Sequence, residues 1–281
     1  MLKTRAASGP SRMILTMTAA AAAALALAPW TGAGAQMSDM GDPESLQRTI
    51  DSGIPETSGV NDPWEGFNRR MFAVNDALDG AVLVPASRAY RTVTVEKQRK
   101  GIRNFLANAR TPVILVNDLL QGEFKRAGTT MGRFVLNTTI GFGGMGDPAE
   151  RLGLAQHSED FGQTLAVWGA PSGPYLVLPF FGSSTLRDGF GAGVDLAIDP
   201  VTWIRGDAAQ ITRFTRAGVT LLAVREPLIE PLAQIEANSL DYYSSVRSFY
   251  IQSRKNAIAN GRANFDDLPD IGEFEEFEDL E

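Results

Sequence analysis

A glycine-rich stretch between residues 141 and 193 constrains the fold of this chain more than any other feature, because it holds 12 of the 28 glycines. Each glycine inside a helix costs about 1 kcal/mol relative to alanine, so the run from Gly141 to Gly146 cannot form a regular helix. The part from Phe161 to Asp188 is also dense in proline and aromatic residues. It offers backbone freedom and apolar surface but no catalytic set. This composition suits the passage of an apolar molecule better than a reaction centre.

Amphipathic helical patterns flank this stretch on both sides. Asp62-Pro63 resembles the N-cap and first position of a helix. Four apolar residues then recur at helical spacing from residue 67 to residue 78, and this helix is expected to end at Gly80. Further helices are expected over residues 87–91, about 95–109, 111–120 (restarting at Thr111-Pro112), 123–139, 208–224 and 228–260. A short helix is expected after Asp147, and another helix is expected to follow a cap at residues 183–185. One extended run, from Tyr175 to Phe181, is too short to make a sheet. The pattern predicts a mainly α fold in one domain.

The two ends of the chain differ from the rest. The first 35 residues resemble an export signal, with basic residues before an apolar run from Met13 to Ala28 and small residues before Gln36. That run is shorter than the roughly 20 apolar residues that span a bilayer. Residues 36–60 are predicted to be a flexible lead-in and residues 262–281 an acidic, disordered tail. Residues 61–261 remain as the helical domain.

Charge and cysteine content exclude some partners. The net charge is −7, and the export signal contributes bases and no acids, so the exported part is more acidic still. Such a chain lacks the positive field that nucleic-acid binding requires, and no nucleic-acid partner is expected. A local basic cluster from Arg91 to Arg110 has two interpretations: contact with anionic lipid head groups or an acidic partner, or an ordinary solvated helix face. The sequence has no cysteine, so it has no disulfide.

Residues with catalytic chemistry form no recognisable active site. His157 is the one histidine, and a serine hydrolase would also need a nucleophile elbow, which is absent, so a surface or loop histidine is expected. One histidine without cysteine also predicts no metal site. The run from Gly141 to Gly146 lacks the Gly-Lys-Ser/Thr ending of a phosphate loop. We therefore expect no enzymatic activity, no metal and no cofactor.

Four segments, in order, resemble the MlaA (VacJ) family of Gram-negative outer-membrane proteins. They are Asp62–Arg69, Val116–Gly122, Arg133–Thr138 and Phe161–Asp188. The likeness is good over residues 61–205 and looser beyond. Many members of that family are lipoproteins anchored through an N-terminal cysteine, which this sequence lacks.

The resemblance implies a compact, ring-like bundle of amphipathic helices with an amphipathic channel. It implies an outer-membrane conduit that removes mislocalised phospholipid from the outer leaflet. The lipid would pass to a periplasmic lipid-carrier protein for return to the inner membrane, and the conduit would associate with an outer-membrane porin trimer. The expected location is the periplasmic side of the outer membrane. Because no cysteine is present, the protein is expected not to be a lipoprotein.

The positions of the family motifs predict a lipid channel or gate, built from the first helix and from residues 161–188. The expected residues are Asn68, Phe72, Asn75, Phe161, Gly162, Tyr175, Pro179, Phe180, Arg187 and Asp188. Arg187 and Asp188 either contact a lipid head group or form an ordinary ion pair. Two other functions stay open: a porin-associated envelope scaffold without transport, and a periplasmic lipid hydrolase that depends on His157.

Overall fold

The computed structural model describes residues 62–206 and 208–260. The expected export signal (1–35), lead-in (36–60) and acidic tail (262–281) lie outside these residues. Most of the described chain is helical, and two short strands form one antiparallel hairpin. The elements are α4 (Glu65–Leu78), the π-helix η1 (Asp79–Leu83), α5 (Val84–Val93), α6 (Glu96–Leu120), α7 (Phe124–Thr139), α8 (Pro148–Arg151), α9 (Phe161–Val167), β1 (Tyr175–Leu178), β2 (Gly182–Thr185), α10 (Leu186–Ile198), the 3-10 helix η2 (Pro200–Trp203), α11 (Ala208–Arg225), the 3-10 helix η3 (Glu226–Leu228), α12 (Ile229–Asn238) and α13 (Tyr242–Ile258).

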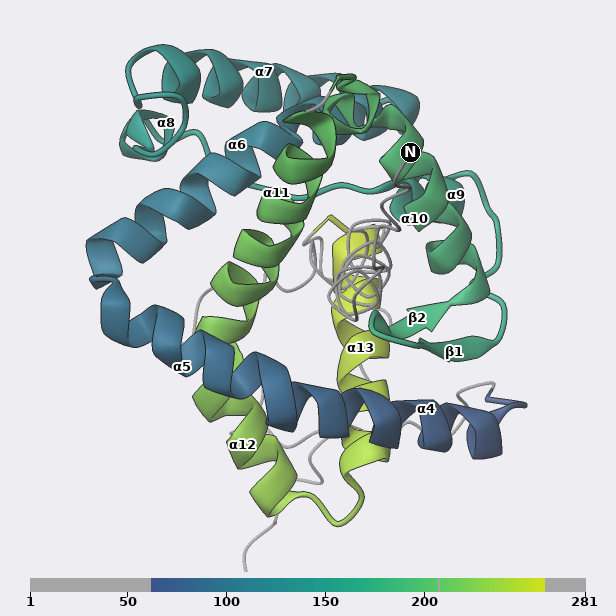
Figure 1. Ribbon diagram of the computed structural model, residues 1–281. Coiled ribbons are helices and arrows are strands. Elements are labelled where there is room, and N and C mark those ends of the chain that lie inside the picture. Colours follow the sequence, from purple (N-terminus) through teal and green to yellow (C-terminus); the bar gives the residue numbers. More distant parts are fainter. Residues whose placement is uncertain (1–61, 207, 261–281) are drawn as a thin grey trace, which may run out of the picture.

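The helices are arranged as a ring (Figure 1). α4, η1 and α5 run along its lower side, α6 rises on the left, and α7 with α8 lies across the top. α9, the hairpin and α10, which hold the part of the glycine-rich stretch from residue 161 onward, close the right side. α11 descends from the top to α12, and α13 runs back up through the middle of the view. The prediction of a mainly α, ring-like bundle is confirmed.

The first helix does not stop at Gly80, as the sequence suggested. α4 continues through the π-helical turn η1 directly into α5. Arg225, at the end of α11, donates two hydrogen bonds of 2.7 Å to the carboxylate of Asp79, the first residue of this turn. The two residues of this ion pair, Asp79 and Arg225, are 146 positions apart along the chain, and their contact stabilises the wider, π-helical turn. Nor does Asp62 cap α4, because its carboxylate accepts bonds from Tyr243 and Arg247 instead.

Pro112 does not restart a helix but lies inside the 25-residue helix α6. Proline in a helix interior costs about 3 kcal/mol, since it removes one backbone hydrogen bond and crowds the preceding turn. The neighbouring Val113 and Ile114 are buried, and α6 packs on α7, α9 and α11. This burial offsets the cost of the proline, which local sequence could not indicate.

The C-terminal helix predicted over residues 228–260 is two helices. α12 ends at Asn238, and α13 begins after Asp241, whose carboxylate accepts bonds from the backbone N–H and hydroxyl of Ser244. Two other predicted caps are confirmed. Asp147 accepts from the N–H of Glu150 at the start of α8, and Thr185 from that of Asp188 at the start of α10.

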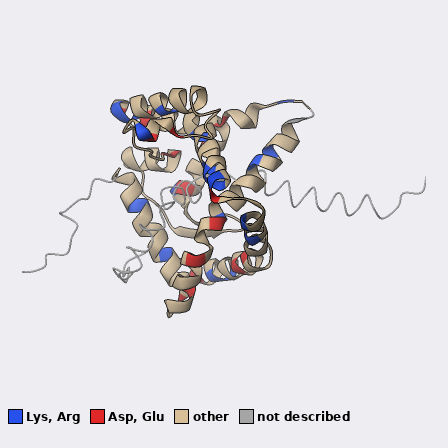
Figure 2. Cartoon of the chain, turned by 90° about the vertical axis from the view of Figure 1, so that its left-hand side faces the viewer, with Lys and Arg blue, Asp and Glu red and all other residues tan. Residues whose placement is uncertain are grey.

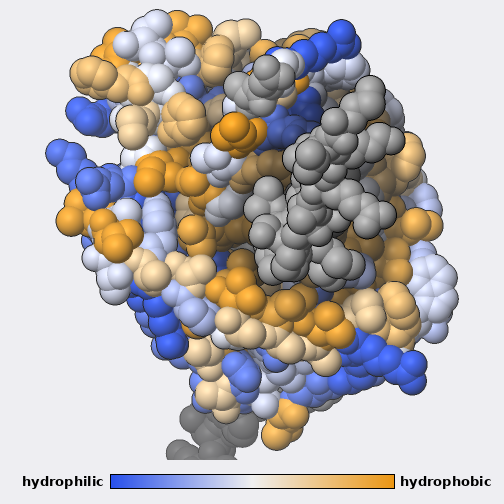
Figure 3. Space-filling view, in the orientation of Figure 1, coloured by the Kyte–Doolittle hydropathy of each residue, from blue (hydrophilic) through white to orange (hydrophobic). Residues whose placement is uncertain are grey.

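A small aromatic core joins the hairpin to α4 and α13. Tyr175 and Val177 of β1 pack with Tyr243 and Tyr250 of α13, and Phe72 of α4 adds edge-on ring contacts. Many large apolar side chains are exposed instead (Figure 3). They include Phe124, Met131, Val135, Ile140 and Phe142, all on α7 or just after it. No helix of the described residues is both long enough and apolar enough to cross a membrane.

Candidate functional site: an amphipathic cavity within the ring

A cavity of about 730 Å³ lies between α6 and α11. Residues of α5, η3 and α12 line one part of it, and residues between 147 and 158 line another. It therefore occupies the part of the ring bounded by α5, α6 and α11 in Figure 1. Its volume is within the roughly 300–1,000 Å³ that is usual for small-molecule sites.

Three arginines and one buried glutamate form a charged wall of this cavity. The Glu226 carboxylate lies 2.7 Å from Arg91 Nε, 3.4 Å from Arg99 Nε and 3.6 Å from Arg103 Nη1. Arg91 also pairs with Glu230, at 2.5 Å. Figure 2, which views this side of the molecule, shows basic and acidic segments interleaved. Part of the basic cluster predicted over residues 91–110 therefore lines a partly enclosed space, where the Arg91 and Arg103 side chains are 34% and 36% exposed.

Apolar side chains form the other wall. Leu106 and Ile114 of α6 face the cavity together with Ala223 and Val224 of α11. Pro227 and Pro231 continue this surface on η3 and α12. A space with one charged and one apolar wall matches an amphiphile, a molecule with a charged head and apolar chains.

His157 lies in a loop, as expected, but not at the surface, since its side chain is only 14% exposed. Its Nε2 atom lies 3.0 Å from Asp118 Oδ1 and 3.0 Å from Thr130 Oγ1. A hydrolytic triad requires the nucleophile and the acid to bond to opposite ring nitrogens. Both contacts here fall on Nε2, so this group does not have the geometry of a triad. Among residues 62–206 and 208–260, no cluster of histidine, cysteine or acidic side chains can hold a metal ion.

Buried carboxylates surround the start of α9. Burial raises the pKa of Glu159 to about 7, although Gln121 and Arg126 bond to its oxygens. Burial and the nearby Asp160 raise the pKa of Asp195 to about 6. Asp160 differs: burial alone would raise its pKa, but Arg254 donates two hydrogen bonds to it and holds the pKa well below its usual value. One ionised and two readily protonated carboxyl groups are thus held within one polar network.

The predicted residues of α4 hold the hairpin in place. Asn68 is fully buried; its Nδ2 donates to the carbonyl of Tyr175, at 3.0 Å, and its Oδ1 accepts from the N–H of Val177, at 2.9 Å. Asn75, two turns further on, donates to the carbonyl of Leu178 and accepts from the N–H of Phe180. The two asparagines thus satisfy backbone groups of β1 and of the turn that follows it.

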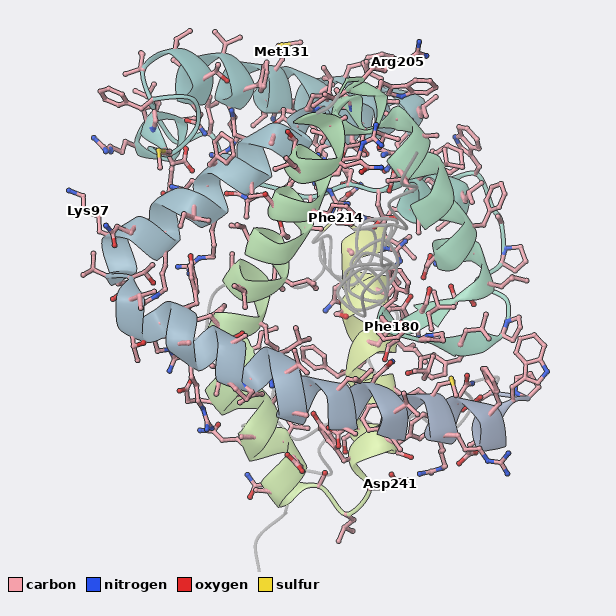
Figure 4. All side chains as sticks on the ribbon, in the orientation of Figure 1. Lys97, Met131, Phe180, Arg205, Phe214 and Asp241 are labelled. Atoms are coloured by element: carbon pink, nitrogen blue, oxygen red, sulfur yellow. The ribbon has the colours of Figure 1, made fainter. Side chains whose placement is uncertain are left out.

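The other predicted residues adjoin this unit. Arg187 and Arg254 pair with Asp188, which also accepts a bond from the buried Tyr250 hydroxyl. Gly162 packs against this cluster, because a Cβ atom there would lie 2.4 Å from Arg254 Nη2. Phe161 makes an edge-on ring contact with Trp168. Pro179 and Phe180 form the hairpin turn, and the turn faces the interior of the ring (Figure 4).

The structure therefore brings the ten predicted residues into one region, but none of them is among those that line the 730 Å³ cavity. The sequence analysis singled out the basic cluster, which provides Arg91, Arg99 and Arg103. It missed Glu226 and the apolar residues of α11. Glu226 carried no local signal, since its role depends on arginines more than 120 residues earlier in the chain.

A helical ring that encloses an amphipathic cavity and exposes apolar side chains defines a lipid-handling class of protein. The model of the family described as MlaA lipoprotein matches residues 60–257. The chain belongs to the MlaA family.

Individual relatives agree with this assignment. The Escherichia coli protein named intermembrane phospholipid transport system lipoprotein MlaA is 35% identical over 234 residues, covering 77% of this chain and 90% of that protein. An uncharacterised Rickettsia typhi protein is 33% identical over 200 residues, 71% of this chain and 78% of the relative. A solved structure described as the structural basis for maintenance of bacterial outer membrane lipid asymmetry is 35% identical and superposes with a TM-score of 0.62. The superposition covers 71% of this chain and 99% of the chain in the solved structure.

These relatives correct the expectation that the protein is not a lipoprotein. The matched family and the relatives from Escherichia coli, Shigella flexneri and Haemophilus influenzae are all named lipoproteins. The expectation relied on the absence of cysteine from the sequence.

Proposed function

We propose that this protein is a conduit for phospholipid in transport between membranes. It removes mislocalised phospholipid from the outer leaflet of the outer membrane and passes it on for return to the inner membrane, which maintains lipid asymmetry. The observation that carries this proposal is the 730 Å³ cavity, with arginines on one wall and apolar side chains on the other. The names of the Escherichia coli relative and of the solved structure support it.

The exposed apolar side chains support contact with a lipid phase. Phe142 is 88% exposed and has a φ of +53°, a left-handed conformation that is unfavourable for a residue with a side chain. Ile140 and Met145 beside it are also exposed. Apolar patches of this kind on a folded protein mark contact with another apolar phase or partner.

The gate of this conduit is proposed to involve the ten residues predicted from the sequence. The hairpin turn carries Phe180, which is 58% exposed and faces the interior of the ring (Figure 4). Asn75 donates to the carbonyl of Leu178, just before this turn, and accepts from the N–H of Phe180 within it, and so fixes the position of Phe180. The buried residues of the set, such as Asn68 and Asp188, would hold the gate rather than touch lipid.

An outer-membrane porin trimer and a periplasmic lipid-carrier protein are the proposed partners. This part of the proposal is supported by the family resemblance. A conduit that makes and breaks no bond needs a donor membrane on one side and a soluble acceptor on the other. The protein is proposed to have no enzymatic activity, in keeping with the Nε2 geometry of His157.

Filling the cavity tests the conduit. Ala107 lines the cavity from α6, and the indole ring of Ala107→Trp would take up part of its volume. We expect cells that rely on this variant to accumulate phospholipid in the outer leaflet, measured by surface labelling of phosphatidylethanolamine. The purified variant should also yield less bound phospholipid on extraction than the parent protein.

Ala109→Trp is the matched control, since Ala109 is on the same helix but does not line the cavity. It should leave both measurements unchanged. If Ala107→Trp folds normally and leaves the phospholipid content of the outer leaflet unchanged, the conduit is rejected and the scaffold function is favoured. Release of fatty acid or lysolipid by the purified protein, lost in His157→Ala, would favour the hydrolase.

A further inference from the structure

The three arginines around Glu226 are unequally satisfied. Arg91 bonds to the Glu226 side chain and backbone carbonyl and to both oxygens of Glu230. Arg99 donates to the backbone carbonyls of Thr94 and Arg91. Within the described residues, Arg103 makes a single ion pair, at 3.6 Å, and no side-chain hydrogen bond. A guanidinium group has five N–H donors, so Arg103 can bind another acceptor.

The local charge is also unbalanced. Three guanidinium groups meet two carboxylates, Glu226 and Glu230. Of the other acids along the cavity, Asp147 pairs with Arg133, Glu150 is 3.9 Å from Lys100, and Glu96 is exposed to solvent. Around Glu226 and Glu230 themselves, guanidinium groups therefore outnumber carboxylates by one. In a partly enclosed space this excess charge attracts an anion more strongly than it would in water.

Ser158 is on another part of the cavity lining, but its hydroxyl lies beneath the cavity surface. The hydroxyl of Ser158 is buried and has no hydrogen-bond partner among the described residues. Buried hydroxyl groups without a partner are uncommon in folded proteins, since each loses its bonds to water. The apolar side chains of Leu106 and Val224 line the same space. A ligand for this cavity therefore has a compact anionic group and an adjoining apolar part.

We infer that the cavity binds the phosphodiester group of a phospholipid, with Arg103 as its principal contact and Arg99 as a further donor. A phosphodiester carries one negative charge, which matches the one guanidinium group in excess around Glu226 and Glu230. Its oxygens accept charge-assisted hydrogen bonds from guanidinium groups. Glu226 serves as the shared counter-charge that keeps the arginines together when no anion is bound. This inference rests on the proposed conduit function and specifies how it recognises the lipid.

The test measures binding of dihexanoylphosphatidylcholine to the purified full chain by calorimetry, below the micelle concentration. Arg103→Gln should weaken binding about tenfold, which corresponds to about 1.4 kcal/mol. Arg103→Lys keeps the charge and should retain most of the affinity. Lys97→Gln is the matched control, because Lys97 is on the same helix but points away from the molecule (Figure 4), and its affinity should equal that of the parent. Unchanged melting temperatures show that all variants fold.

Ligand analogues identify the source of the anion. Dihexanoylglycerol, which lacks the phosphate, should bind at least tenfold more weakly than the phospholipid and be insensitive to Arg103→Gln. Inorganic phosphate and glycerophosphocholine, which lack the apolar part, should also bind weakly. The inference is overturned if Arg103→Gln binds the phospholipid as well as the parent does. It is also overturned if inorganic phosphate alone binds as tightly as the phospholipid.

The two proposals fail separately. If Ala107→Trp disturbs lipid asymmetry while Arg103→Gln binds normally, the conduit stands and the phosphodiester site is rejected. If neither variant changes lipid binding or lipid asymmetry, the conduit itself is rejected.

Discussion

Asn68 and Asn75 lie seven residues apart on α4, which places them on one face of the helix, two turns apart. Together they satisfy four backbone groups of β1 and of the turn after it. β1 is paired with β2 on one side only, so its other edge would otherwise present open donors and acceptors. Two amide side chains thus replace part of a third strand. This gives the asparagine at residue 68 a structural role in this chain.

Asn68→Ala should lower the free energy of unfolding by about 2–4 kcal/mol, because it leaves a buried carbonyl and a buried N–H without partners, at roughly 1–3 kcal/mol each. Urea denaturation followed by circular dichroism measures the change. Asn238→Ala is the control, since Asn238 is exposed at the end of α12, and it should change the value by less than about 0.5 kcal/mol. Equal stability of the two variants would show that the asparagine clamp contributes nothing.

At the scale of elements, α9 and α10 approach closely because glycines face each other at the contact. A Cβ atom on Gly191 would lie 2.3 Å from the backbone nitrogen of Gly162. This approach brings Asp160, at the start of α9, close enough to Asp188 of α10 for Arg254 to bond to both. The glycine concentration read from the sequence therefore serves the packing of two helices, along with several turns.

Gly191→Ala should destabilise the protein by about 1–3 kcal/mol, because a methyl group there forces α9 and α10 apart. Gly193→Ala is the matched control on the same helix, since a Cβ atom there has no neighbour within 4 Å. It should stabilise the protein by up to about 1 kcal/mol, the difference between glycine and alanine in a helix. Thermal unfolding of both variants decides the matter, and a stable Gly191→Ala protein would contradict the close packing.

At the scale of the whole molecule, buried polar groups connect elements that the small aromatic core does not reach. Arg254 of α13 ties α9 to α10, and Arg225 of α11 reaches the turn between α4 and α5. The Glu226 cluster connects α5, α6 and η3. A ring with a cavity has little interior for one large apolar core, and these charged contacts connect its elements around the ring.

The stability of the whole ring should depend on pH near neutrality. Glu159, with a pKa of about 7, and Asp195, with a pKa of about 6, bind protons more tightly in the folded than in the unfolded chain. Their contribution to the free energy of unfolding is therefore fully present below their pKa values in the unfolded chain, which are near 4, and it is lost as the pH rises through 6 to 7. We expect the free energy of unfolding to fall between pH 5 and pH 8, as measured by urea denaturation.

Glu159→Gln should flatten this slope, because glutamine resembles the protonated acid at every pH. Glu230→Gln is the control: its pKa is lowered by Arg91, so it stays ionised across this window and its loss should leave the slope intact. A slope unchanged by Glu159→Gln would rule out proton binding at this buried carboxyl.

The sequence by itself determined the features whose physics is local. The caps at Asp147 and Thr185 depend on hydrogen bonds that span three residues, and the amphipathic stripes depend on helical periodicity, so both were predictable. Continuation of the helix past Gly80 and through Pro112 was not, because an ion pair from Arg225 and burial of α6 outweigh the local preference.

Only the tertiary structure decided where the cavity lies. Its charged wall joins arginines of residues 91–103 to Glu226, and its apolar wall joins α6 to α11. The sequence contains each of these side chains, but their meeting depends on how the ring closes, and no short-range pattern encodes the distance between residues that far apart along the chain.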